Sequence, residues 1–373
     1  MPEVCIASGR VVRGAYIARM PPLSRAARAF AAGTLALSCA APPPTPSTVI
    51  AAADQRSGTT ALLIAVSAVD DHVAWASGQD ATWLRTRDGG EHWEVGRVPG
   101  ADSLQFRDVE AFDGNEAFLL SIGNGPQSRI YHTADGGAHW TLQFTNADPK
   151  GFYDCLGFWD RARGIAIGDA VNDAISLLRT NDGGAHWERV PPDSLPRALP
   201  GEGSFAASGT CLATRPGGRA WIVMNNAAHA RVMSTRDYGA HWRIDTLPLT
   251  TRDGVGAQSV SFRDDLHGIV LAGGYAAKGG DVEVARTRDG GVTWSNGGSP
   301  PLATGVWGGV YVPHARDALV VAVGPSGAAY SNDDGATWAR IDSLVYWSVG
   351  FASPAAGWAV GKGGRITRLA AAR

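Results

Sequence analysis

The sequence predicts an all-β fold built from seven four-stranded units, and three observations support this prediction. An eight-residue motif with Asp, Gly and Trp at fixed places recurs six times. Its Trp residues lie 44 to 55 residues apart, which is the usual length of a four-stranded repeat. The chain also has 48 Gly and 13 Trp, and only 18% of its residues are charged. This composition suits an all-β repeat protein.

The motif has the chemistry of a tight turn between two strands. Its first copy is TRDGGEHW, residues 86–93. The Asp carboxylate can accept hydrogen bonds from nearby backbone N–H groups, and the Gly two residues later can take a positive φ. The Trp can bury its ring between neighbouring sheets. The six Asp and Trp pairs are Asp88 and Trp93, Asp135 and Trp140, Asp182 and Trp187, Asp237 and Trp242, Asp289 and Trp294, and Asp333 and Trp338.

Each unit contains an apolar strand, a strand rich in Ala and Gly, a strand that runs into the motif and a strand after the Trp. In the third unit these are YDCLGFWD, GIAIGD, ISLLRT and HWERV. A seventh unit has only three such runs, YWSVGF, GWAVGK and RITRL, at 346–351, 357–362 and 365–369. We therefore predict seven blades within one domain, residues 48–373.

The missing outer strand of the seventh blade is expected at the other end of the domain. Residues 48–53 read TVIAAA and are followed by a turn-like DQRSG. Pairing this strand with the seventh unit would close the ring and remove a long unpaired edge. The alternative is that residues 48–57 form only a flexible tether.

The repeated motif resembles the Asp box, also called the BNR repeat. Together with the WAVG-like second strands and the seven units, it is similar to the photosystem II stability/assembly factor-like family of propellers, over residues 58–373. The resemblance implies that the boxes lie on the outer rim and are structural. It also implies a binding or assembly scaffold, without transferring a photosystem client.

The first 47 residues have the pattern of a bacterial export signal. Arg25 and Arg28 precede a short apolar run at 29–37, and a Pro-rich stretch follows Cys39. This run is too short to span a bilayer. The sequence ALSC resembles a lipobox, which would make Cys39 a lipidation site, although its Ala and Leu depart from the usual pattern. Ordinary cleavage after a small residue such as Ala40 is the alternative.

We accordingly assign residues 1–38 to a signal peptide, with Met20 as the natural initiator, and residues 39–47 to a linker. The expected location is the periplasm or the outer membrane, as a lipoprotein. Residues 48–373 hold 28 basic and 34 acidic residues, a formal net charge of −6. That balance argues against nucleic acid or an anionic membrane surface as a partner.

Propellers with Asp boxes include hydrolases, so an enzymatic function is an alternative to a scaffold. A sialidase-like site needs three Arg residues and a Tyr nucleophile, and the family marks the first Arg with R-I-P. None of the four Arg-Ile pairs here is followed by Pro. A xyloglucanase-type enzyme would need a second propeller. We predict no catalytic residues and no cofactor, and keep a secreted carbohydrate-active hydrolase as the alternative.

The His residues are candidates for a metal site, and the Cys residues are candidates for a disulfide. Four His residues precede a motif Trp, but equivalent places on different blades cannot converge on one metal, so no metal site is expected. These are His92, His139, His186 and His241. Cys155 and Cys211 fall at matching positions of adjacent inner strands, which predicts a disulfide in an exported protein. Two buried free thiols are the alternative.

The long polar loops predict the binding surface. Loops between second and third strands, and those between successive blades, share one face of a propeller, and most long loops here are of these kinds. We expect an envelope protein or protein complex to dock there on a monomer, over blades three to five. The residues expected to bind are Asp169, Asn172, Asn225, Asn226 and His229.

Overall fold

A computed structural model describes residues 48–205, 207–278 and 281–372 of the chain. The predictions for the signal peptide, Met20, the lipidated Cys39 and the linker fall outside these residues. Within the described part, no helix has the length and apolar character needed to cross a membrane.

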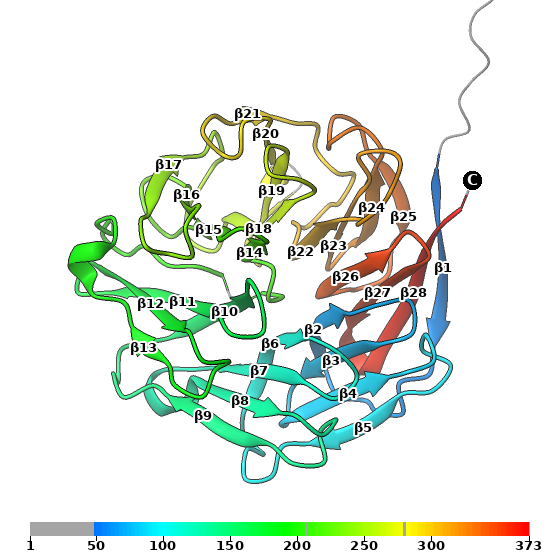
Figure 1. Cartoon of the computed structure of the whole chain (residues 1–373). Coiled ribbons are helices and arrows are strands. Elements are labelled where there is room, and N and C mark those ends of the chain that lie inside the picture. Colours follow the sequence, from blue (N-terminus) through cyan, green and yellow to red (C-terminus); the bar gives the residue numbers. More distant parts are fainter. Residues whose placement is uncertain (1–47, 206, 279–280, 373) are drawn as a thin grey trace, which may run out of the picture. The chain divides into compact units, whose positions relative to one another are not determined.

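Seven antiparallel sheets of four strands follow one another around a central axis (Figure 1). The first strand of each sheet lies nearest the axis and contacts the first strand of the next sheet, and the seventh contacts the first. The prediction of an all-β, seven-bladed propeller is confirmed.

The strands of the first four sheets follow the order of the chain. The first sheet has β2 (Leu63–Ala68), β3 (Ala74–Gly78), β4 (Thr82–Thr86) and β5 (Glu94–Arg97), and the second has β6 (Gln105–Ala111), β7 (Ala117–Ile122), β8 (Arg129–Thr133) and β9 (Thr141–Thr145). The third has β10 (Tyr153–Phe158), β11 (Gly164–Val171), β12 (Ala174–Thr180) and β13 (Glu188–Arg189), and the fourth has β14 (Leu212–Arg215), β15 (Arg219–Met224), β16 (Arg231–Thr235) and β17 (Arg243–Thr246).

The last three sheets include the one strand that breaks this order. The fifth has β18 (Gly256–Phe262), β19 (Gly268–Gly273), β20 (Val284–Thr287) and β21 (Ser295–Asn296), and the sixth has β22 (Gly308–Tyr311), β23 (Val320–Gly324), β24 (Gly327–Ser331) and β25 (Ala339–Asp342). The seventh has β26 (Ser348–Ser353), β27 (Ala356–Gly361), β28 (Arg365–Ala372) and β1 (Val49–Gln55). Short 3-10 turns are η1 (Gly125–Gln127), η2 (Pro192–Ser194) and η4 (Lys362–Gly364).

Most second strands are almost wholly apolar because both faces of each sheet are covered by neighbouring sheets. Every residue of β3, β19, β23 and β27 is buried. The outer strands are short and mostly exposed, as in β13 and β21. This gradient explains why each unit has an Ala- and Gly-rich run at the place of its second strand.

Aromatic side chains fill the space between sheets. Trp140, from the second box, packs against Trp75 and Trp83 of the first sheet, with ring centroids 6.3 and 6.0 Å apart. Trp221 of the fourth sheet stacks on Phe262 of the fifth at 3.6 Å. Rings of this size bury much apolar surface, so these contacts stabilise the packing of each sheet against its neighbour.

The six boxes share one hydrogen-bond pattern, which the first box illustrates. Asp88 Oδ1 accepts from the backbone N–H of His92 at 2.9 Å and from the Thr86 hydroxyl at 2.9 Å, while Gly90 N–H donates to Thr86 Oγ1 at 2.8 Å. Gly90 has a φ of +89°, as the turn requires. The box therefore fastens the third strand to the fourth in each of the first six sheets.

The seventh sheet takes its outer strand from the beginning of the domain. β1 pairs with β28 in continuous register from Val49↔Ala372 to Gln55↔Ile366. The strand continues through Asp54 and Gln55, two residues beyond the predicted start of the turn, because the side chains of both residues have hydrogen-bond partners. Thr367 Oγ1 donates to Asp54 Oδ1 at 2.7 Å, and the Gln55 side chain accepts from the Trp93 indole N–H at 3.2 Å.

Candidate binding face around the central channel

The loops between second and third strands lie on the same face as the connections between sheets, which we call the connection face. The Asp boxes lie on the opposite face, because each box joins a third strand to a fourth. All five residues predicted to bind a partner belong to loops or strand ends on the connection face of the third and fourth sheets.

Three of these five residues are exposed, and they come from two hairpins. Asn172 and Asn226 have φ of 52° and 60°, the left-handed backbone that Asn adopts more readily than most residues. His229 is also exposed. These side chains are accessible to a partner on the connection face.

The prediction is wrong for Asn225, which is fully buried. Its Oδ1 accepts from the backbone N–H of Ala257 at 2.6 Å, and its Nδ2 donates to the Ala257 carbonyl. The amide thus takes the place of a backbone partner and joins the fourth sheet to the fifth. A polar residue in a loop was expected to face solvent, but here it satisfies backbone groups that would otherwise be buried and unpaired.

Asp169 is partly buried and holds the connection between the third and fourth sheets. Its Oδ1 accepts from the backbone N–H of Ser204 at 3.2 Å. Burial raises the pKa of this carboxyl to about 6, and the Ser204 hydrogen bond offsets only part of that shift. Asp169 therefore orders the loop, and it is less accessible than the sequence suggested.

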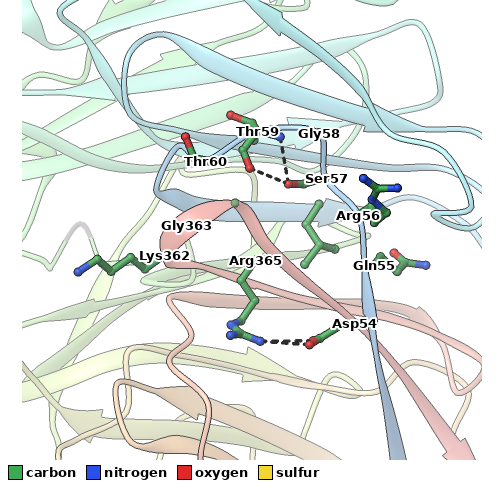
Figure 2. A pocket seen from close by; sticks show the side chains of 12 residues that line it. Asp54, Gln55, Arg56, Ser57, Gly58, Thr59, Thr60, Lys362, Gly363 and Arg365 are labelled. Atoms are coloured by element: carbon green, nitrogen blue, oxygen red, sulfur yellow. Dashed lines mark hydrogen bonds and ion pairs between the residues drawn. The ribbon is translucent and has the colours of Figure 1, made fainter.

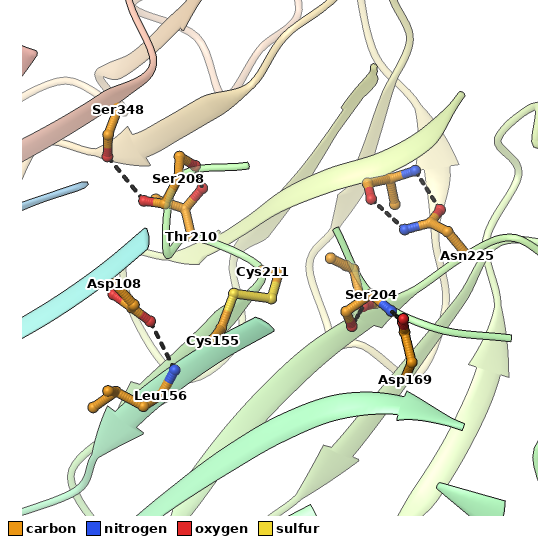
Figure 3. The surroundings of a disulfide bond; sticks show 12 residues. Asp108, Cys155, Leu156, Asp169, Ser204, Ser208, Thr210, Cys211, Asn225 and Ser348 are labelled. Carbon is orange, nitrogen blue, oxygen red and sulfur yellow. Dashed lines mark hydrogen bonds between the residues drawn. A yellow bond between two sulfur atoms is a disulfide. The ribbon is translucent and has the colours of Figure 1, made fainter. Parts of the chain in front are cut away.

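The connection between the third and fourth sheets crosses the axis. We call residues 207–211 the crossing segment. The Ser208 hydroxyl donates to the Trp307 carbonyl at 2.7 Å. The Ser348 hydroxyl donates to the Ser208 carbonyl at 3.0 Å (Figure 3). A segment that enters the fourth sheet is therefore bonded to residues at the start of the sixth and seventh sheets.

A disulfide holds the end of the crossing segment. Cys155 of β10 is joined to Cys211, with Cα atoms 6.1 Å apart, and both residues are fully buried (Figure 3). Beside it, Gly209 approaches Asp108 so closely that a Cβ on this glycine would lie 2.2 Å from Asp108 Oδ1. The crossing segment is thus fixed at several points.

Below the crossing segment lies a central cavity of about 360 Å³. Most of its lining residues come from the inner strands, with Val66, Val260 and Phe351 among them, but the lining surface itself is more polar than apolar. Asp108 and Glu110 of β6 are the charged side chains among the described residues that line it. Burial raises the pKa of Glu110 to about 7, and burial together with Glu110 raises the pKa of Asp108 well above its usual range.

This cavity does not have the layout of a sialidase site. Both carboxyls come from one strand, and Asp108 Oδ2 already accepts from the backbone N–H of Leu156 at 2.7 Å. Arg residues that could clamp a substrate carboxylate are not among the described residues of its lining. The arrangement can bind a proton, but it lacks the cluster of cations that such hydrolysis needs.

Two tryptophans and an arginine lie where the channel meets the connection face. Trp307 and Trp347 immediately precede the inner strands of the sixth and seventh sheets, are half-buried, and have ring centroids 4.3 Å apart. The Arg107 guanidinium lies 5.4 Å from the Trp347 ring. We call these three residues the axial cluster.

The sequence analysis did not identify the axial cluster, because a Trp beside an apolar strand is usually a buried core residue. Its sequence signal was present, since both Trp residues follow inter-sheet connections and stand just before an inner strand. Half-buried Trp and Arg at the centre of a surface are typical of interface hot spots.

The box histidines lie on four different sheets, and each ring nitrogen Nδ1 contacts the Asp of its own box at 2.6 to 2.7 Å. In the fifth and sixth boxes a Thr hydroxyl takes this place. Among the described residues, the first box alone groups three potential ligands, Asp88, Glu91 and His92, and all three are exposed.

Known proteins that are similar to this chain are also Asp-box propellers. A family model described as photosynthesis system II assembly factor Ycf48 matches residues 54–150. The photosystem II assembly protein Ycf48 of Thermosynechococcus vestitus is 28% identical over 287 residues, covering 63% of this chain and 72% of that protein. The chain is an Asp-box propeller that resembles the Ycf48 assembly factors.

Solved structures share the fold at lower identity. A structure described as Ycf48 bound to D1 peptide has a TM-score of 0.60 and 20% identity, and covers 86% of this chain and 96% of its own. Ycf48 from Cyanidioschyzon merolae has a TM-score of 0.61 and 16% identity, with 86% and 99% covered. A GH74 xyloglucanase from Xanthomonas campestris has a TM-score of 0.61 and 14% identity, and only 53% of that enzyme is covered.

Proposed function

We propose that this chain is an exported, non-enzymatic scaffold that binds a segment of an envelope protein on its connection face. The observation that carries the proposal is the axial cluster, a half-exposed Trp307–Trp347 pair with Arg107 beside it. The Ser208 hydroxyl of the crossing segment donates to the backbone carbonyl of Trp307, so the backbone that carries this ring is held in place before a partner arrives. Preorganised aromatic anchors lose little entropy on binding.

The resemblance to Ycf48 supports a protein partner. A similar propeller is described as bound to a peptide, which shows that this fold can present a peptide-binding surface. We infer that the exposed Asn172, Asn226 and His229 add polar contacts at the rim of the same face. Polar rims around an apolar centre are the usual organisation of such interfaces.

The test is site-specific photo-crosslinking in the intact cell envelope. A photoreactive residue replacing Asn226 on the connection face should give a defined adduct, and one replacing the exposed Leu266 on the opposite face should not. Adding Trp307→Ala and Trp347→Ala to the first variant should reduce the adduct about tenfold or more, because hot-spot losses commonly exceed 2 kcal/mol. Equal adducts from both faces would contradict the proposal.

The alternative function, a carbohydrate-active hydrolase, is tested separately. The fold is shared with a xyloglucanase, but likeness at 14% identity speaks only to architecture. We expect no turnover of sialosides or of a plant-polysaccharide panel by the purified protein. Turnover that Glu110→Gln removes would favour the enzyme instead.

A further inference from the structure

The outer strand of the seventh sheet differs from the outer strands of the other six sheets. β1 has seven residues and pairs with β28 without a bulge. The other outer strands have two to five residues and are β5, β9, β13, β17, β21 and β25. β1 is therefore the longest outer strand of the described sheets, and it lies at the rim of the propeller (Figure 1).

The six other outer strands carry features that discourage pairing with another chain. β13 and β21 have only two residues each. β9 and β25 pair with their neighbours across a bulge. β5 begins with Glu94 and ends with Arg97, and β17 begins with Arg243 and contains Asp245. Short strands, bulges and charges are the means by which proteins protect exposed sheet edges.

β1 has none of these features over its first five residues. Residues 49–53 read VIAAA and contain neither a charge nor a proline. Residues 51–53 are all exposed, and because successive side chains point to opposite faces, both faces of the strand are open there. The backbone groups of residues 49–54 form no hydrogen bond to a described residue outside β28. An edge of this kind is a template for another strand.

The edge of β1 is held in place at both ends. Before it, the Thr48 carbonyl accepts from Asn332 Nδ2 of the sixth box at 2.9 Å. At its end, Gln55 bonds to the first box. Asp54 lines the pocket beside this end, and Arg365 Nη1 of β28 lies 3.4 Å from both Asp54 oxygens (Figure 2). The one charge on β1 is thus compensated within its own sheet.

We propose that β1 pairs with the β1 of a second copy of this chain, antiparallel and about a two-fold axis. Such an interface uses the same residues on both copies, so it must be self-complementary. β1 meets this condition, because a pairing centred on Ala51, Ala52 or Ala53 places no two like charges of β1 opposite each other. Each copy has one edge of this kind among its described sheets, so the pairing closes at a dimer.

This dimer differs from the monomer expected from the sequence, and it does not depend on the axial cluster or on the function proposed above. β1 shares no residue with the axial cluster. A failure of the dimer would therefore leave the proposed binding of an envelope protein untouched, and the crosslinking at Asn226 measures that binding separately.

The experiment is sedimentation analysis of the purified full chain over a wide range of concentration. We expect a reversible equilibrium between monomer and dimer, because a seven-residue edge is small for an interface. Ala51→Lys with Ala53→Lys should weaken the dimer at least about tenfold, since each of the three registers sets new charges of the two copies directly opposite each other. Both side chains are exposed, so the monomer should keep its melting temperature.

The matched control is Ala138→Lys with Ala185→Lys. These alanines are exposed in the second and third boxes, at the position where the first box has Glu91. Residues 48–373 carry a formal net charge of −6, so both double variants reduce the general repulsion between copies equally. The control should therefore dimerise at least as tightly as the unchanged protein.

A cysteine scan measures the same contact without relying on charge. Directly opposite residues of antiparallel strands have Cα atoms about 4.5–5.5 Å apart, a spacing that a disulfide can bridge. In a chain with Cys5→Ser and Cys39→Ser, the residue at the axis should give a covalent dimer on mild oxidation, and the exposed Ala185→Cys should not. The variants compared are Ala51→Cys, Ala52→Cys and Ala53→Cys.

Three results would overturn the proposal. The first is a chain that stays monomeric up to about 1 mM, whether its edge is then open or covered by a different segment. The second is an assembly larger than a dimer, because the pairing of two single edges closes. The third is an equal loss of dimer in the two Lys variants, which would place the contact away from β1.

Discussion

Gln55 connects the strand that closes the ring to the first Asp box, and its replacement tests how much that connection contributes. Its Oε1 accepts from the Trp93 indole at 3.2 Å, and its Nε2 donates to the Gly89 carbonyl at 3.0 Å. The Gly89 carbonyl also accepts from Arg368 at 3.0 Å, so it keeps a partner if Gln55 is removed. The buried Trp93 N–H would not.

We expect Gln55→Ala to lower the free energy of unfolding by about 2 kcal/mol, because an unpaired buried donor costs about 1–3 kcal/mol. Gln55→Leu keeps the side-chain volume but removes the acceptor, so it should cost a similar amount. Gln55→Glu keeps an acceptor for Trp93 while placing a carboxylate against the Gly89 carbonyl. Its cost should therefore persist at neutral pH and shrink in acid.

The assay is urea denaturation followed by tryptophan fluorescence and by far-UV circular dichroism. Gln143→Ala is the control, since Gln143 lies on β9, an outer strand of another sheet, and has no described side-chain partner. It should change stability by less than about 0.5 kcal/mol. If Gln55→Ala behaves like this control, β1 is not fastened to the first sheet in the way the structure indicates.

Three further outcomes are expected. A chain that begins at Thr59 should melt at a lower temperature and aggregate more than one that begins at Ser47, because it exposes the edge of β28; equal melting would contradict ring closure by β1. Non-reduced peptide mapping of protein isolated without reductant should recover Cys155 linked to Cys211, and replacing both with Ala should cost roughly 2–4 kcal/mol; free thiols at both positions would refute the link. Asp169 has a pKa raised to about 6 from 3.8, so the folded state holds its proton more tightly than the unfolded state. Stability should fall by on the order of 2 kcal/mol as pH rises from about 4 to 6, and Asp169→Asn should remove that slope.

The repeat made the architecture predictable from the sequence. Asp88 and Trp93 recur with their glycines at a constant spacing, and each copy meets the same local requirement, so one motif defined all six hairpins. The pairing of Cys155 with Cys211 also followed from the repeat, since equivalent positions on adjacent inner strands must lie close together.

The candidate site was predicted less well because it depends on departures from the repeat. The path of the crossing segment has no periodic signal, and nothing local indicates that Ser208 reaches the sixth and seventh sheets. Asn225 was expected at the surface, and only the three-dimensional arrangement shows that its amide matches the backbone of Ala257. From the sequence, Trp307 and Trp347 resemble core residues, and only the structure shows that their rings lie together near the axis of the propeller.

The pairing of β1 with β28 has a consequence for the order of folding. Residues 49–55 meet residues 366–372, so the two partners are separated by almost the whole domain. Closing so long a loop is entropically costly, and contacts of this kind form late. During synthesis β1 has no strand to pair with until β28, at the other end of the domain, has been made. An exported chain that reaches its compartment unfolded would avoid this delay, because all seven sheets could then assemble together.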